Sequence, residues 1–316
     1  MTNVTIKNGV FCGKEMNGEF ILVKDWQSNT KPQGGHVTVK HGTQTIRINV
    51  AQENVMEAVS TESYEDILAR INKRFNIMER MTSGVINGTI KSLIIAGAPG
   101  VGKTYGTERM LKAAEADGMI RFDHIKGRMS AIGLFKKLFE NSDKGAVVVI
   151  DDCDDIFADD TAMNVLKGAL DSSEERWISW NTDSLSLEKE GIPQKFRFDG
   201  TVIFITNLNF QSIIDAGKAM APHMEALISR SVYLDLALHD RKAVMARVED
   251  LAFNTPMLYS KGLSKGEVKL AIDWLKENSA NLRTLCCRTA LKLAQFVATD
   301  EDWMDIAEVT LLRPKS

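Results

Sequence analysis

The sequence lacks several features that mark particular classes of protein. No apolar run approaches the roughly 20 residues that cross a bilayer, and the opening MTNVTIKNGV is too polar for a signal peptide. The four cysteines, Cys12, Cys153, Cys286 and Cys287, have no zinc-knuckle spacing. The net charge of -3 argues against electrostatic capture of nucleic acid over the whole surface, but not against a local basic groove. These absences predict a cytoplasmic protein with reduced thiols and no membrane partner.

Three regions of the chain differ in hydrophobic pattern. Residues 1–56 alternate apolar and polar residues, which predicts a small β-rich segment with a hairpin around His41-Gly42. Residues 57–237 alternate strand and helix patterns, which predicts a parallel sheet covered on both faces. Residues 238–316 are helical, with a capping box at Ser264 and Glu267. The strands are expected at 92–96, 119–125, 146–150, 201–206 and 231–236, and the C-terminal helices at 240–253, 264–279 and 281–298.

The segment IIAGAPGVGKTYGTERML, residues 94–111, has the pattern of a phosphate-binding loop, Gly-x4-Gly-Lys-Thr, between a strand and a helix. The glycines let several N–H groups face one phosphate, and the helix N-terminus adds a positive dipole end. Lys103 is expected to bind the β- and γ-phosphates and Thr104 to bind Mg²⁺. A chance glycine-rich turn is the alternative. The predicted cofactors are ATP or ADP and Mg²⁺, and the residues predicted to bind them are Gly97, Ala98, Pro99, Gly100, Val101, Gly102, Lys103, Thr104 and Tyr105. The predicted fold class is therefore α/β: a P-loop doubly wound parallel five-stranded sheet, a C-terminal helical domain and a small β-rich N-terminal segment.

Two aspartates follow the next buried strand. The run AVVVI ends in Asp151 and Asp152, at the carboxyl edge of the sheet, where ligands gather in open α/β folds. We expect Asp151 to hold Mg²⁺, through water, and Asp152 to polarise the attacking water as a catalytic base. The alternative is a solvated acidic turn, the role expected of Asp154 and Asp155 as caps of the following helix.

The order of phosphate loop, acidic strand, IFITN and ALISRS resembles the AAA+ ATPase superfamily over about residues 57–300. Within it, LKGALDSSEERWISW is similar to ATPase modules of tailed-phage genomes. The resemblance implies hydrolysis of Mg-ATP, a C-terminal helical lid, and a homo-oligomeric ring or spiral in which six subunits are expected. The family usually has Asp-Glu where this chain has Asp151-Asp152. The side chain of Asp152 is one methylene shorter than the usual glutamate. This puts the rate of hydrolysis in question, whereas nucleotide binding is still expected.

The resemblance also assigns further catalytic residues. Asn207, after the strand TVIFIT, is expected to read the γ-phosphate, in preference to Thr206, because an amide bonds both water and a phosphate oxygen. ALISRS resembles the Ser-Arg-Cys stretch of sliding-clamp loaders, so Arg230 is expected to reach a neighbouring subunit's γ-phosphate. Arg283, at the expected start of a helix, corresponds to the arginine of the lid, and Arg288 is expected to face elsewhere. The alternative for Asn207 is a turn at the end of the strand. The alternative for Arg230 is an ion pair on the surface, and for Arg283 a solvated position on a helix.

Two segments are candidates for gripping a partner. Residues 126–129, Lys-Gly-Arg-Met, stand where unfoldases of the family present an aromatic tip, and their basic pair is compatible with phosphate contacts. Residues 176–200 alternate like a β-hairpin whose aromatics and arginines are compatible with base stacking. The alternatives are a solvated loop and a hairpin packed on its own domain. The residues concerned in the hairpin are Arg176, Trp177, Trp180, Phe196, Arg197 and Phe198.

These patterns predict an AAA+ ATPase that hydrolyses Mg-ATP between subunits and drives remodelling or loading on nucleic acid or nucleoprotein, in phage replication or growth within the host cytoplasm. A protein remodeller or unfoldase is the first alternative. A nucleotide-gated scaffold that hydrolyses slowly is the second, and the short side chain of Asp152 keeps it open. A small-molecule kinase is disfavoured, because it would need neither Arg230 nor a separate lid.

Overall fold

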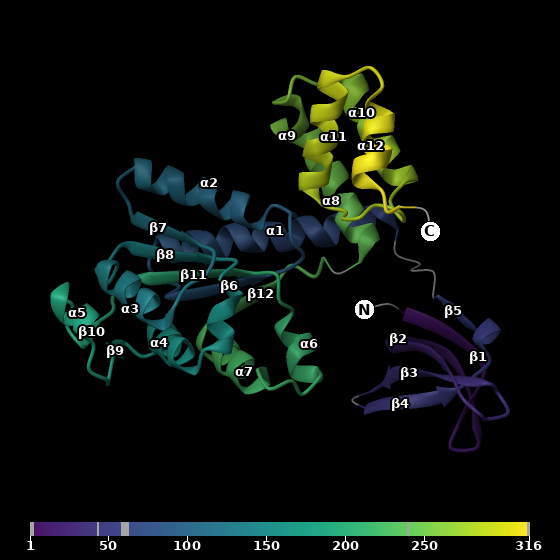
Figure 1. Ribbon diagram of the computed structural model, residues 1–316, viewed down its shortest axis with the longest axis horizontal. Helices are drawn as coiled ribbons and strands as arrows, with labels where there is room; N and C mark the ends of the chain where they lie inside the picture. Colours follow the sequence, from purple (N-terminus) through teal and green to yellow (C-terminus); the bar gives the residue numbers. More distant parts are fainter. Residues whose placement is uncertain (1–2, 43, 58–62, 239, 315–316) are drawn as a thin grey trace. The chain divides into compact units, whose positions relative to one another are not determined.

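The computed structural model describes residues 3–42, 44–57, 63–238 and 240–314 (Figure 1). The chain forms two compact units, Met1–Ile67 and Leu68–Ser316. Within the described ranges, no helix combines the length and the apolar character that crossing a membrane requires. The predicted division into a β-rich segment (1–56), a sheet domain (57–237) and a helical lid (238–316) stays our proposal.

The first unit is a small antiparallel barrel. Its strands follow the order β2-β3-β4-β1-β5, and β1 also pairs with β2, so the sheet closes on itself. Buried valines and isoleucines from alternate strand positions fill the interior, with Ile6, Val37, Val39 and Ile48 at zero exposure. The predicted hairpin is confirmed, since His41 pairs with Gln44 across the turn. The elements are β1 (Asn3–Phe11), β2 (Lys14–Ser28), β3 (Gly35–His41), β4 (Gln44–Asn49), the 3-10 helix η1 (Gln52–Asn54) and β5 (Val55–Glu57).

The second unit contains the predicted parallel sheet, with the strand order β12-β6-β11-β8-β7 in the described residues. The three central strands are buried along their whole length, which is why they read as unbroken aliphatic runs. Their carboxyl ends meet at one edge, because Ala96, Thr206, Ile205 and Asp151 are neighbours in register. The strands are β6 (Ser92–Ala96), β7 (Arg121–Lys126), β8 (Ala146–Asp151), β11 (Thr201–Thr206) and β12 (Val232–Asp235).

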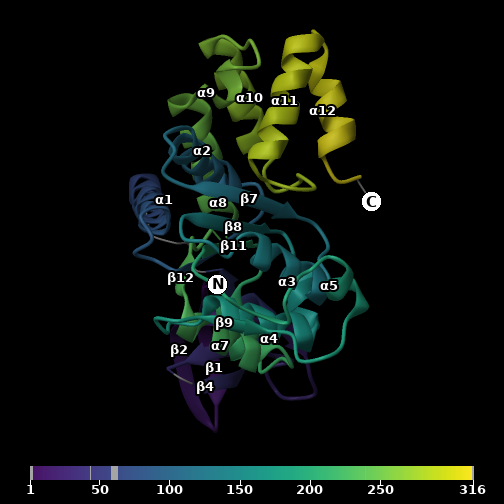
Figure 2. The same ribbon diagram turned by 90° about the vertical axis from the view of Figure 1, so that its left-hand side faces the viewer.

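Helices cover both faces of this sheet, as predicted for a doubly wound fold. Helices α1 and α2 lie on one face, and α3, α4, α6 and α7 lie on the other (Figures 1 and 2). A hairpin, β9 (Trp177–Ser179) and β10 (Lys195–Arg197), carries the short helix α5 (Leu185–Lys189) between its strands. The covering helices are α1 (Tyr64–Ile86), α2 (Lys103–Ala116), α3 (Ala131–Glu140), α4 (Asp160–Leu170), α6 (Phe210–Asp215) and α7 (Ala221–Arg230).

The chain ends in a group of helices that pack on one another, α8 (Arg241–Asn254), α9 (Pro256–Tyr259), α10 (Lys265–Glu277), α11 (Cys287–Thr299) and α12 (Trp303–Leu311). The predicted capping box at Ser264 and Glu267 is present at the start of α10. The helix expected over 281–298 begins later, at Cys287. Leu282 is buried and bridges Leu312, so the segment before Cys287 is extended and not helical.

Candidate nucleotide-binding site

The phosphate loop lies between β6 and α2, where the sequence predicted it. Gly100 and Gly102 have φ angles of +68° and +99°, left-handed conformations that glycine adopts without strain. Helix α2 begins at Lys103, immediately after the loop, so its free N-terminal N–H groups adjoin the loop. These residues fit a phosphate, because a bent glycine loop and a helix N-terminus provide N–H donors for an anion.

The side chain of Lys103 is buried and folds back onto the loop. Its Nζ donates hydrogen bonds to the carbonyl oxygens of Gly97 at 2.6 Å and Ala98 at 2.8 Å, and to Oδ1 of Asn207 at 2.9 Å. Burial lowers the pKa of Lys103 to about 8, and the nearby carboxylate of Asp152 offsets part of that effect. The ammonium is thus held by neutral acceptors at a place where a phosphate would supply charged ones.

Thr104 and Asp151 form the candidate magnesium site. The Thr104 hydroxyl donates to the Asp151 carboxylate, 3.0 Å from Oδ2 and 3.2 Å from Oδ1. Among the residues that the structure describes, no three His, Cys, Asp or Glu side chains gather to hold a metal by themselves. A hydroxyl and one carboxylate nevertheless fit Mg²⁺ bound with a nucleotide, because this ion takes most of its ligands from phosphates and water.

Asp152 and Asn207 meet beside this site. Asp152 has a φ angle of +54°, a left-handed conformation that aspartate tolerates better than most residues. Its Oδ1 accepts a hydrogen bond from Nδ2 of Asn207 at 2.7 Å. The same amide accepts from Lys103, so Asn207 connects the lysine of the loop to the carboxylate after β8.

The neighbouring polar residues have structural partners. Thr206, the second candidate for reading the γ-phosphate, donates its hydroxyl to Asp154 at 2.7 Å. The expectation that Asp154 and Asp155 cap the next helix is wrong. Both lie in the 3-10 helix η2 (Asp154–Ala158), and Asp159 caps α4 by accepting from two backbone N–H groups. The helix begins later than expected because η2 intervenes.

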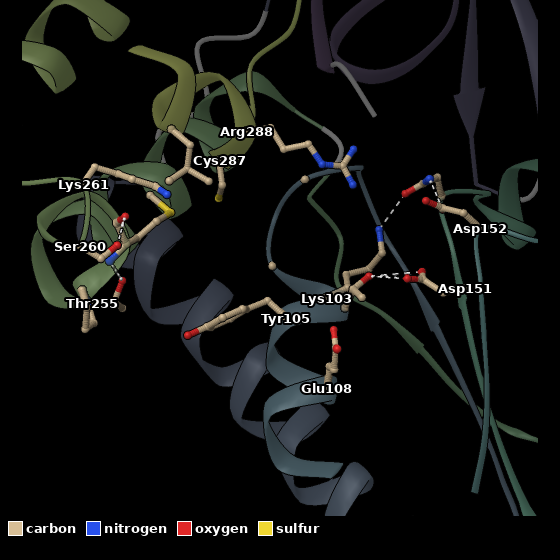
Figure 3. A pocket seen from close by; sticks show the side chains of 17 residues that line it. Lys103, Tyr105, Glu108, Asp151, Asp152, Thr255, Ser260, Lys261, Cys287 and Arg288 are labelled. Atoms are coloured by element: carbon tan, nitrogen blue, oxygen red, sulfur yellow. Dashed lines mark hydrogen bonds between the residues drawn. The ribbon is translucent and has the colours of Figure 1, made fainter. Parts of the chain in front are cut away.

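A cavity of about 570 Å³ connects the loop to the C-terminal helices, which is within the range of small-molecule sites. On the sheet side it is lined by phosphate-loop residues, Tyr105, both aspartates and Asn207. On the other side it is lined by residues of α9 and α11 and the segments flanking them (Figure 3). The contributors from the C-terminal helices are Thr255, Pro256, Met257, Ser260, Lys261, Cys287, Arg288 and Leu291.

The arginine that enters this cavity is Arg288 and not Arg283. Arg283 is exposed, and its Nε donates to the carbonyl oxygen of Leu312 at 2.8 Å, away from the cavity. Arg288 extends from the start of α11 toward Lys103 and Asp152 (Figure 3), and its charge contributes to lowering the pKa of Lys103. The expectation that Arg288 faces elsewhere is wrong, because Arg283 precedes the helix, which begins at Cys287.

Arg230 lies at the amino-terminal edge of the sheet, opposite the carboxyl edge where the phosphate loop lies. Its carbonyl oxygen accepts a hydrogen bond from Ser92, the first residue of β6, whereas the phosphate loop follows the last residue of that strand. Five residues of strand, or roughly 13 Å, separate the two ends. The Arg230 guanidinium donates to the carbonyl oxygen of Ala226 at 2.9 Å and lines a shallow polar depression with Asp171. The structure therefore does not bring Arg230 to the phosphate loop of its own chain.

The two partner-gripping candidates differ in their burial. Arg176 of the hairpin is buried at 3% exposure, and Phe196 and Phe198 are buried as well, so the hairpin packs on its own domain. Trp177 remains half exposed, with Lys195 over its ring. In the loop after β7, the side chain of Arg128 is 90% exposed and lies 3.5 Å from Asp155. Of these segments, the basic loop is the more accessible to a partner.

Sequence reasoning missed two residues, one beside Asp151 and a second beside the first. His124, on β7, places Nε2 3.3 Å from Oδ2 of Asp151. Glu108, on α2, lines the cavity, and its carboxylate lies 4.0 Å from Nδ1 of His124. The signal that could have found Glu108 is its spacing, one helical turn after Thr104 on the same face.

The fold and the site define a P-loop α/β protein whose phosphate loop faces a group of C-terminal helices. No family model matches the chain. The sequence is 43% identical, over 317 residues and 97% of each chain, to an uncharacterized 36.7 kDa protein of Enterobacteria phage T4 from the nrdC–mobD intergenic region. The chain belongs to the family of this phage protein.

Similar solved structures include a point mutant of Thermotoga maritima RuvB, with 14% identity and a TM-score of 0.44 over 78% of this chain and 67% of that one. NtrX from Brucella abortus in complex with ATP is 12% identical, with a TM-score of 0.44 over 77% of this chain and 55% of that one. Both belong to the AAA+ superfamily that the sequence resembles.

Proposed function

We propose that this chain is an AAA+ ATPase that binds Mg-ATP between its parallel sheet and its helical lid. The observation that carries the proposal is the convergence of Lys103, Thr104, Asp151, Asp152 and Asn207 on one cavity, from the ends of two strands and a helix N-terminus. A structural role alone does not require a buried lysine and two carboxylates, one of them at a positive φ, at one open sheet edge.

Each side chain has a role in this account. Lys103 leaves its carbonyl acceptors and binds the β- and γ-phosphates. Thr104 and Asp151 hold the ion, which, when bound, neutralises charge on the phosphate oxygens. Asp152 accepts a proton from the attacking water, and Asn207 keeps that carboxylate oriented. Arg288 brings the lid onto the γ-phosphate, so loss of that phosphate releases the lid.

Arg230 acts on a neighbouring copy in the same proposal. It lies at the edge of the sheet away from its own loop, and a head-to-tail assembly places that edge against the next subunit's cavity. There the guanidinium stabilises charge that develops on the transferred phosphoryl group. We therefore propose a homo-oligomer, a ring or spiral for which six subunits are expected.

The work done by this cycle is proposed to be remodelling or loading on nucleic acid or nucleoprotein during phage growth in the host cell. The T4 relative supports a role in a phage. The exposed Lys126, the last residue of β7, and Arg128, on the loop after it, provide positive charge for phosphate contacts. The missing aromatic at this loop makes pulling on a polypeptide the less favoured use.

A nucleotide-gated scaffold with slow turnover is a second candidate, and one observation favours it. Asp152 is short, and its carboxylate is already bonded to Asn207 at 2.7 Å. Both features reduce its reach toward a water. In this second candidate function, ATP binding drives assembly of the subunits, and ATP hydrolysis ends that assembly.

Turnover assays with single-stranded DNA, duplex DNA and an unfolded protein separate these functions. Stimulation by nucleic acid that falls steeply with salt supports the proposed function. Stimulation by polypeptide alone replaces it with a protein remodeller. Negligible turnover under every condition, together with ATP-dependent assembly, supports the scaffold. Failure of the protein to bind ATP at all contradicts the whole proposal.

A further inference from the structure

We propose that His124 is a positioning residue for the magnesium ion, because it fixes the carboxylate of Asp151. The inference rests on the proposed function, since it requires Mg-ATP in the cavity. His124 lies on β7, next to β8, and its side chain is only 12% exposed. The AAA+ resemblance gives this histidine no role.

The contact to Asp151 is directional. Nε2 of His124 lies 3.3 Å from Oδ2 of Asp151, and a carboxylate can only accept there, so Nε2 carries the proton. Thr104 donates to the same oxygen at 3.0 Å. Two donors from different elements, a strand and a helix, therefore meet at Oδ2 and fix the rotation of the carboxylate.

The second carboxylate oxygen is left less occupied. From the residues that the structure describes, Oδ1 of Asp151 accepts only the longer contact from Thr104, at 3.2 Å. That oxygen is the one available to a water on the ion, because Oδ2 is already committed to two donors. His124 thus leaves one oxygen of a buried carboxylate for the metal, as carboxylate and histidine partners do around metal sites.

Glu108 adjoins the histidine on its other side. Its Oε2 lies 4.0 Å from Nδ1 of His124, too far for a direct hydrogen bond. Glu108 is itself held by Lys112, 2.8 Å away along α2, which lowers the pKa of Glu108. The imidazole ring is therefore enclosed between a carboxylate of α2 and a carboxylate of β8.

A purely structural histidine would stabilise the fold without changing how the ion binds. The two roles differ in one measurable quantity, the factor by which Mg²⁺ strengthens nucleotide binding. Loss of an outer partner of a metal ligand typically weakens metal binding by about 10-fold to 100-fold. Binding of a nucleotide without metal depends on Lys103 and the loop, whereas the contact of His124 is with Asp151.

The experiment measures affinity for a fluorescent ATP analogue in EDTA and across a Mg²⁺ titration. In His124→Leu, the affinity in EDTA should stay within about twofold of wild type, and the strengthening by Mg²⁺ should fall about 10-fold. His124→Gln should restore most of it, because the glutamine amide can donate near the position of Nε2.

His223→Leu is the matched control, since His223 also contacts an aspartate, Asp160 at 3.2 Å, outside the cavity. It should leave the Mg²⁺ effect unchanged. Wild-type strengthening by Mg²⁺ in His124→Leu overturns the inference, as does an equal loss in EDTA and in Mg²⁺. A His124→Gln variant that folds but behaves like the leucine variant also overturns it. If Mg²⁺ does not strengthen binding to the wild-type protein, the proposed function fails and the inference fails with it.

Discussion

The backbone N–H of Cys287 donates a hydrogen bond to the carbonyl oxygen of Gly100 at 2.8 Å. This bond attaches the first residue of α11 directly to the phosphate loop. A Cβ at Gly100 would lie 2.9 Å from Cβ of Cys286, so the two segments pack with no room for a methyl group. The loop and the C-terminal helices must therefore respond together when a phosphate enters.

Gly100→Ala should weaken ATP binding about 10-fold or more, because it combines backbone strain at a φ of +68° with the clash against Cys286. Gly118→Ala is the matched control. Gly118 has a φ of +70°, but its Cβ would meet no atom within 4 Å. Both variants should lose stability in thermal melts from the same backbone strain, with a further loss from the clash in Gly100→Ala, and only Gly100→Ala should lose affinity in equilibrium titrations. Equal affinity in the two variants contradicts the coupling.

The affinity for ATP should fall as pH rises through the pKa of Lys103, about 8. Below this pH the ammonium is already charged. Above it the free protein must take up a proton to bind phosphate, which costs about 1.4 kcal/mol, or tenfold, per pH unit. Titrations with a non-hydrolysable analogue between about pH 7 and about pH 9.5 check this slope. Lys103→Arg should flatten it, because arginine stays charged throughout, and an equally flat wild-type profile would contradict the account.

Arg288→Ala should reduce Mg-ATP affinity about 10-fold, since it removes a charge-assisted hydrogen bond to phosphate. Arg283→Ala is the paired control and should stay within about twofold of wild type, because its guanidinium bonds the carbonyl oxygen of Leu312 outside the cavity. Limited proteolysis with and without ATP should show nucleotide protection of the lid in Arg283→Ala only. The reverse ranking of the two variants would return the lid role to Arg283.

Asp152→Asn should lower ATP turnover by about 100-fold or more while leaving ATP affinity unchanged, because the amide cannot take a proton from water. Asp152→Glu should keep or raise turnover, since it restores the longer side chain usual in the superfamily. Asp155→Asn is the control from the same acidic run, and its exposed side chain faces Arg128. Steady-state phosphate release measures all three. Wild-type turnover in Asp152→Asn would remove Asp152 from the mechanism.

Local pattern was enough to predict the sheet and one half of the site. The strands at 92–96 and 201–206 match the structure residue for residue, because a fully buried parallel strand has an unbroken aliphatic sequence. The phosphate loop and Asp151 followed from their positions at the ends of such strands. The carboxyl ends of β6, β8 and β11 are close in register. The strand order alone therefore brings the phosphate loop and Asp151 together.

The other half of the cavity depends on contacts that local pattern does not contain. The sequence pattern favoured Arg283 over Arg288. The bridge from Leu282 to Leu312 delays the start of α11, and Arg288 is the arginine that lines the cavity. His124 reads as an ordinary strand residue until the neighbouring strand places Asp151 beside it. Long-range packing, and not propensity, decides both cases.

The central claim is that two copies of the chain share each nucleotide site, and mixing two inactive variants tests it most directly. Lys103→Ala should lose ATP binding, and Arg230→Ala should keep binding but lose turnover. In an equimolar mixture, about a quarter of the interfaces pair an intact loop with an intact Arg230 from the neighbour, so turnover should reappear. A mixture as inactive as either variant alone, or full turnover by Arg230→Ala by itself, would contradict the shared site.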